Sequence, residues 1–145
     1  MEQDKWNEGI AGLFILEQKC KPNLKMFDTA KIEGVHSGYG NKHVRTFFLQ
    51  PTKLEITDYC AIGKGKNLLL NLDPKVSVKD ISVSNLEMTA ILQHTKGRRI
   101  VVQMRGVMDP EVVDGYYSEG FGIPIANKML KVIVPSHSSE TIFSW

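Results

Sequence analysis

The chain has 145 residues, of which 42% are hydrophobic and 23% are charged, and its formal net charge is +2. This length fits one domain with a core that folds unaided and is short for two domains, while the small positive surplus gives no argument for nucleic acid as a partner. No apolar run in the sequence approaches the roughly 18 residues of a membrane span, so no membrane partner is expected.

Apolar and polar residues alternate along much of the chain, which is typical of half-buried strands. No stretch carries an apolar helical stripe over three turns with matching caps. The alternation and the turn signals between segments predict strands over residues 11–20, 30–36, 42–50, 53–59, 66–72, 75–81, 84–94, 98–105, 111–121, 127–134 and 139–144. The sequence therefore predicts an all-β fold, an antiparallel β-sandwich of roughly ten or more strands with little or no helix, in a single domain over residues 1–145.

Two hairpins are the clearest local predictions. One runs from His43 to Asp58 around a turn that contains Pro51, and the other runs from Leu86 to Met104 with the residues TKGR at its tip. The glycine-rich residues 63–67 are also interpreted as a hairpin turn, because the Lys-Ser/Thr pair of a phosphate loop is missing and no helix follows.

The four histidines are scattered along the chain without a metal-ligand spacing, so no metal is predicted here. His36 and His43 would meet Asp58 if adjacent strands place all three on one face of the sheet, and they are otherwise ordinary strand-end histidines. Cys20 and Cys60 cannot form a disulfide framework and are predicted to be buried thiols.

The segment GVHSGYG at residues 34–40, together with Arg45 after it, carries the candidate catalytic groups. Removal of a proton next to a uronate carboxylate, the chemistry of polysaccharide lyases, needs a Tyr or His base and a partner that neutralises the carboxylate. His36, Tyr39 and Arg45 supply these residue types, so they are the catalytic candidates. The alternative is that the segment is a bend between two strands.

Candidate substrate-binding residues lie in three places. His43 follows the glycine-rich bend, and Arg98 and Arg99 lie in a turn where they would bind an anionic sugar group through charge-assisted hydrogen bonds. Tyr116 and Tyr117 would stack on sugar rings. The alternatives are a solvated hairpin tip for the arginines and a strand bend with core aromatics for the tyrosines.

Two long stretches together carry a family resemblance. Residues 33–74, with a histidine, Gly, Tyr, a second His followed by Arg, and a strand pair ending in Asp, and the closing residues 116–145 resemble the C-terminal β-sandwich of the heparinase II/III-like family. Residue by residue, the resemblance carries over to His36, Gly38, Tyr39, His43 and Arg45.

The resemblance implies that this chain is the distal part of a larger protein whose upstream α/α toroid packs with the sandwich. In the lyases of this group the reaction is β-elimination on acidic polysaccharide. Their His-x-His-x-Asp and His-Asn-Thr segments, associated with catalysis and zinc, are not found here and are expected upstream of Met1. We therefore expect an inactive fragment without a cofactor, and zinc in the parent protein. A lyase parent is expected in the periplasm or at the cell envelope, with a cytoplasmic location as the alternative. The alternative is a non-catalytic carbohydrate-binding or structural interaction module.

Overall fold

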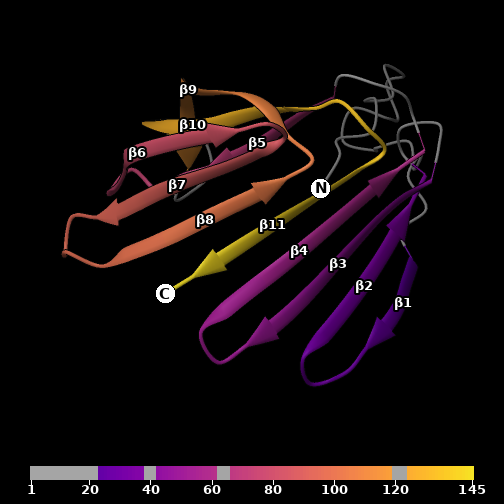
Figure 1. The fold of residues 1–145 in the computed structure, drawn as a ribbon. Coiled ribbons are helices and arrows are strands. Elements are labelled where there is room, and N and C mark those ends of the chain that lie inside the picture. The colour runs from indigo at the N-terminus through magenta and orange to yellow at the C-terminus, as the bar shows by residue number, and fades with distance from the viewer. Residues whose placement is uncertain (1–22, 38–41, 62–65, 119–123) are drawn as a thin grey trace, which may run out of the picture.

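The computed structural model describes residues 23–37, 42–61, 66–118 and 124–145, which form strands and no helix. No helix that could cross a membrane occurs in these ranges. The strands are β1 (Asn23–Phe27), β2 (Lys31–His36), β3 (His43–Gln50), β4 (Lys53–Cys60), β5 (Lys66–Asn71), β6 (Val76–Ser84), β7 (Glu87–His94), β8 (Arg99–Arg105), β9 (Met108–Ser118), β10 (Pro124–Val134) and β11 (Ser138–Ser144). The predicted all-β antiparallel fold is confirmed (Figure 1).

The strands form two antiparallel sheets of unequal size. The larger sheet has the order β1-β2-β3-β4-β11-β8-β7-β6, and the smaller has the order β5-β10-β9. Figure 1 shows the smaller sheet beside β6 and β7, while β1 to β4 fan away from it. The sandwich is therefore two layers thick over one half of the larger sheet, and the other half extends beyond the smaller sheet.

The hydrophobic core lies between the two layers. Strand β10 contributes Leu130, Val132 and Val134, which alternate with more exposed residues as the sequence pattern predicts. From the larger sheet, Val102 and Met104 of β8 pack into the same cluster. The buried cluster draws on β7 and β8 in the larger sheet. Among the residues whose burial is described, it includes none of β1 to β4, so the core stabilises the covered half of the sandwich.

Both predicted hairpins are confirmed, with pairing from His43↔Cys60 to Gln50↔Lys53 in one and from Glu87↔Arg105 to Gln93↔Arg99 in the other. The predicted strand 11–20 lies outside the described residues, and the sequence patterns missed β1. The predicted strand 84–94 was wrong at its start, because β6 continues to Ser84. Asn85 follows in the left-handed region at φ 54°, a conformation that Asn tolerates in tight turns.

The Asp109-Pro110 turn signal lies inside β9, which begins at Met108. Lys131 pairs with Glu111 and Ile133 with Met108, so Asp109 and Pro110 together oppose a single residue of β10. This is a β-bulge, with Asp109 at φ 51°. Pro110 is tolerated because β9 is an edge strand of the smaller sheet.

The connection from β4 to β5 corrects the hairpin interpretation of residues 63–67. Strand β4 pairs with β3 and β11 in the larger sheet, whereas β5 pairs with β10 in the smaller one. The chain therefore passes from the larger sheet to the smaller one between Cys60 and Lys66, and residues 62–65 of this connection lie outside the described residues. Glycine-rich composition signals a change of direction, and it does not distinguish a hairpin from a crossover.

Gly115→Ala is expected to lower the free energy of unfolding by about 1–3 kcal/mol, because an added Cβ overpacks the site. That Cβ would lie 2.8 Å from Asn127 Oδ1. Asn127 cannot easily move, since its Nδ2 donates hydrogen bonds of 2.6 Å to Asn71 Oδ1 and to the Leu72 carbonyl. Urea unfolding followed by circular dichroism measures the loss. Gly34→Ala is the matched control, because a Cβ added there would meet no atom within 4 Å; equal stability of the two variants would contradict the overpacking.

Candidate functional site

A cluster of polar side chains lies at one end of β2, β3 and β4. The strand register pairs His36 with His43 and Arg45 with Asp58. Paired residues on neighbouring antiparallel strands point to the same face of a sheet, and so do residues two apart on one strand. The conditional sequence prediction that His36, His43 and Asp58 meet on one face is therefore confirmed.

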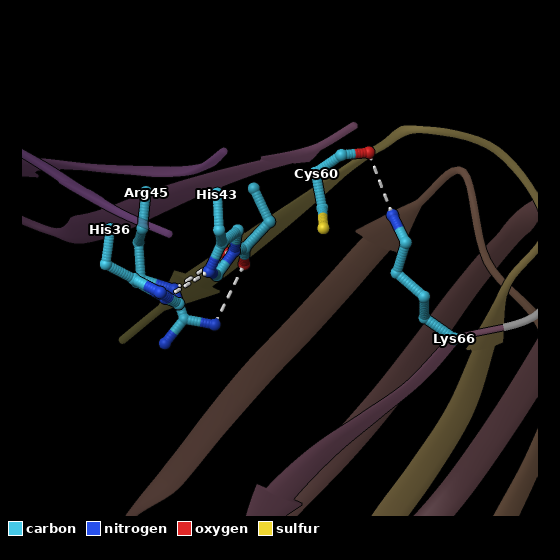
Figure 2. Close-up of polar contacts among 6 residues, drawn as sticks. His36, His43, Arg45, Cys60 and Lys66 are labelled. Atoms are coloured by element: carbon cyan, nitrogen blue, oxygen red, sulfur yellow. Dashed lines mark hydrogen bonds and ion pairs between the residues drawn. The ribbon is translucent and has the colours of Figure 1, made fainter. Parts of the chain in front are cut away.

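The hydrogen bonds in this cluster form a continuous chain. His36 Nε2 lies 2.8 Å from His43 Nδ1, and His43 Nε2 lies 2.8 Å from Asp58 Oδ1. Arg45 donates from Nε to Asp58 Oδ1 at 2.8 Å and from Nη2 to Asp58 Oδ2 at 3.2 Å. Figure 2 shows His36, His43 and Arg45 gathered on one side. Asp58 thus accepts hydrogen bonds from both Arg45 and His43, and through His43 it is linked to His36.

The acceptors in this chain fix the protonation of His43. An ionised carboxylate accepts hydrogen bonds, so His43 must carry its proton on Nε2 where it faces Asp58. Its Nδ1 is engaged with His36. Both ring nitrogens of His43 are therefore occupied, and it cannot also serve as the base for the Cys60 thiol opposite it on β4. The cluster can orient groups and hold charge, but it is not a cysteine–histidine nucleophile pair.

The burial of Asp58 is balanced by its two neighbours. The Asp58 side chain is 13% exposed and that of His43 is 15%, while Arg45 keeps 41% of its side chain exposed. A carboxylate removed from water in this way needs a cation or several donors, and the two-point Arg45 contact supplies both. Arg45 therefore holds Asp58 with one edge of its guanidinium and presents the remainder to the space outside.

That space is a cleft between the two sheets, with a volume of about 290 Å³. The polar cluster lines one wall through His43, Arg45 and Asp58. Leu68 of β5 and Val134 of β10 supply apolar surface from the smaller sheet. The cleft thus lies between β3 and β4 of the larger sheet and β5 and β10 of the smaller one.

Around the Cys60 carbonyl, the cleft holds two groups that the sequence patterns did not single out as site residues. Lys66 Nζ donates to the Cys60 carbonyl at 3.1 Å, and His137 Nδ1 lies 3.2 Å from the same oxygen. In Figure 2 Cys60 lies between the histidine–arginine cluster and Lys66. Lys66 starts β5 and His137 precedes β11, so no motif spacing links them. The sequence indicates only that a lysine and a histidine lie at the starts of two strands, each after turn residues.

The other predicted site residues lie elsewhere. Arg99 starts β8 and pairs with Gln93, whereas Arg105 at the other end of β8 pairs with Glu140, near the cleft. Arg98 and Arg99 therefore lie at the far end of β8 and do not join the cluster. Tyr116 and Tyr117 pair with Ala126 and Ile125, at the end of β10 away from Val134. Tyr116 is 75% exposed, which corrects its interpretation as a core aromatic.

Tyr39 lies outside the described residues. Cys60 is 7% exposed and free, as the prediction of a buried thiol states. The predicted sites therefore divide into one assembled cluster, His36, His43 and Arg45 around Asp58, and two separate surface groups.

The cluster does not fit a zinc ion. A zinc site needs several unprotonated donors that converge on one point. His43 uses both ring nitrogens within the cluster, and Asp58 is already bridged by the Arg45 cation, which would repel a metal dication. No group of three or more His, Cys, Asp or Glu side chains suited to a metal is found among the residues that the structure describes.

Comparisons with known proteins agree with the fold. Residues 3–145 match the family described as heparinase II/III-like, C-terminal. A solved structure of a heparinase III with methylated lysines aligns with a TM-score of 0.66 and 16% identity, over 86% of this chain and 21% of that chain. At this identity the likeness shows the fold, and the chain spans about a fifth of that heparinase III. No curated protein matches the sequence.

Proposed function

The chain belongs to the heparinase II/III-like C-terminal family, and from that membership we propose that it is the distal β-sandwich domain of a longer protein that acts on acidic polysaccharide by β-elimination. In this proposal an upstream α/α toroid is its partner within the parent protein, and a zinc ion, where the parent holds one, is bound by upstream residues. Within the parent protein this domain contributes contacts to the substrate. The isolated chain has no lyase activity.

The observation that carries the proposal is the cleft beside the His43–Asp58–Arg45 cluster. β-Elimination requires a base, a proton donor for the leaving oxygen and a group that neutralises the uronate carboxylate. Arg45 and Lys66 both line the cleft, and Asp58 is its one carboxylate among the described lining residues. The cleft can therefore hold the anionic group of a sugar and help to neutralise it.

The same cleft also supports the expected inactivity of the isolated chain. His43 has both ring nitrogens engaged, and no tyrosine is among the described residues that line the cleft. A β-elimination needs a base beside the sugar proton and also an acid for the leaving oxygen. With His43 engaged, the Nε2 of His137 is the one ring nitrogen left among the described lining residues, and it can fill only one of these two roles. In the proposed parent protein the toroid supplies the Asn, His and Tyr set for this step.

The test compares the full-length protein with the 145-residue chain on heparin and on alginate, and follows the absorbance of the unsaturated uronate product. We expect product from the full-length protein and none from the isolated chain. Product from the chain alone would contradict the proposed inactivity. A full-length protein that leaves acidic polysaccharides intact would contradict the lyase proposal.

One observation favours the alternative of a non-catalytic carbohydrate-binding module. Tyr116 is 75% exposed on β9, and Tyr117 follows it on the same strand. An exposed aromatic ring is suited to stack on the apolar face of a sugar. In this alternative, sugar binding maps to Tyr116 and Tyr117, or to Arg98 and Arg99, instead of to the cleft.

A further inference from the structure

We propose that the cleft binds a single acidic sugar residue, with its anionic group, a carboxylate or a sulfate ester, at Lys66 and one of its hydroxyl groups at His137. The inference rests on the proposed function, because it assigns a subsite to the acidic polysaccharide. It concerns the part of the cleft around the Cys60 carbonyl, which Lys66 approaches from the smaller sheet and His137 from the residue before β11 in the larger sheet.

The ring of His137 is fixed in one orientation by its backbone contact. A carbonyl oxygen accepts hydrogen bonds, so His137 must donate from Nδ1 to the Cys60 carbonyl. A neutral histidine protonated on Nδ1 carries its lone pair on Nε2. His137 lines the cleft and is exposed, and its Nε2 makes no hydrogen bond within the described ranges. This nitrogen can accept a hydrogen bond from a sugar hydroxyl.

The charges along the cleft favour an anion on the Lys66 side. Asp58 is the one carboxylate among the described lining residues, and Arg45 holds both of its oxygens. The negative charge of Asp58 is thereby offset on its own wall. Lys66 uses one of its three ammonium donors on the Cys60 carbonyl. Its two other donors remain for a ligand, and its positive charge has no carboxylate partner in the described part of the chain.

The size and the surface of the cleft suit one sugar ring. Its volume of about 290 Å³ is near the lower end of the range of about 300–1,000 Å³ that is typical of small-ligand pockets. Leu68 and Val134 provide apolar surface for the C–H face of the ring. Asn67 and Ser139 add polar groups beside the apolar surface. A small ligand with one charge and several hydroxyl groups matches this lining.

The test is a nuclear magnetic resonance titration of the 145-residue chain with sodium glucuronate, glucose 6-sulfate and glucose. We expect the two acidic sugars to shift the His137 ring resonances and the Lys66 and Leu68 signals, and glucose to bind about tenfold more weakly or not at all. A preference between glucuronate and glucose 6-sulfate identifies the anionic group. Equal binding of glucose would overturn the inference, and so would shifts confined to Tyr116 and Tyr117 or to Arg98 and Arg99.

Variants test the two contacts separately. Lys66→Met keeps the aliphatic stem and removes the charge, so it should weaken glucuronate binding about tenfold. Lys79→Met, at an exposed position of β6 that does not line the cleft, should leave the binding unchanged. His137→Asn should weaken binding of both acidic sugars and of glucose. Unchanged binding in Lys66→Met would overturn the inference, and the wild-type comparison of glucuronate with glucose decides the matter if a variant fails to fold.

The outcomes separate this inference from the proposed function. Glucuronate bound in the cleft of a protein whose full-length form performs no elimination would support the subsite and contradict the lyase proposal. Elimination by the full-length protein, with no acidic sugar binding in this cleft, would overturn the subsite and leave the proposed function standing.

Discussion

Replacement of Asp58 by asparagine in the full-length protein is expected to lower kcat/KM on acidic polysaccharide by about 10²–10⁴-fold. Asparagine keeps the shape of the side chain, but it loses the charge that pairs with Arg45 and offers an N–H where His43 also donates. The His43 ring would then turn or change its tautomer, and Arg45 would lose its two-point anchor. Steady-state kinetics on heparin or alginate measures the effect.

The matched control is Glu111→Gln, which neutralises a carboxylate paired with Lys131 on the smaller sheet. The Glu111 side chain is 61% exposed, and this pair lies on β9 and β10 outside the cluster, so turnover should stay at the wild-type level. Thermal unfolding of both variants separates a loss of folded protein from a loss of activity. A folded Asp58→Asn protein with wild-type turnover would contradict a role for the cluster in the reaction.

The Asp58 cluster could be predicted from the sequence, because the pairing of Arg45 with Asp58 depends on a single short hairpin. The alternation of residues 42–50 and 53–59 and the turn at Pro51 set the register of β3 against β4. Once that register is fixed, the period of two places Arg45 opposite Asp58. The contact of His36 with His43 needed one further pairing, between strands that are adjacent in the chain.

The placement of Lys66 and His137 at the cleft could not be predicted from the sequence, because it depends on strand pairings that are distant along the chain. Lys66 and Cys60 belong to different sheets, and the glycine-rich connection between them reads equally well as a hairpin or a crossover. His137 is brought to the cleft by β11, which inserts between β4 and β8. Strand alternation predicts which face a residue occupies, but it carries no information on the order of strands in a sheet.

The same limit explains why the predicted sugar-binding residues do not converge. Arg98 and Arg99 were combined with Tyr116 and Tyr117 by residue type alone. Strand β8 runs antiparallel to β11, which places Arg105 near Glu140 and leaves Arg99 at the far end of the sheet. Residue type alone therefore selects candidate contact residues, and the sheet topology places them away from His43.

Leu130→Ala is expected to lower the free energy of unfolding by about 2–5 kcal/mol. Leu130 is fully buried on β10, the central strand of the smaller sheet, and it belongs to the same cluster as Val102 and Met104 of the larger sheet. Truncation to alanine removes buried apolar surface and leaves a cavity between layers that can close only in part. Chemical denaturation followed by circular dichroism measures the loss.

Leu69→Ala makes the same chemical change on the neighbouring strand β5, where the side chain is 52% exposed, so it should cost less than about 1 kcal/mol. Leu70, one residue later, pairs with Leu130 and packs against the core. The contrast between Leu69 and Leu130 thus tests which face of the smaller sheet is turned inward. Equal losses would contradict that layering. They would also remove the basis for the cleft, because Lys66 and Leu68 reach it from the same strand.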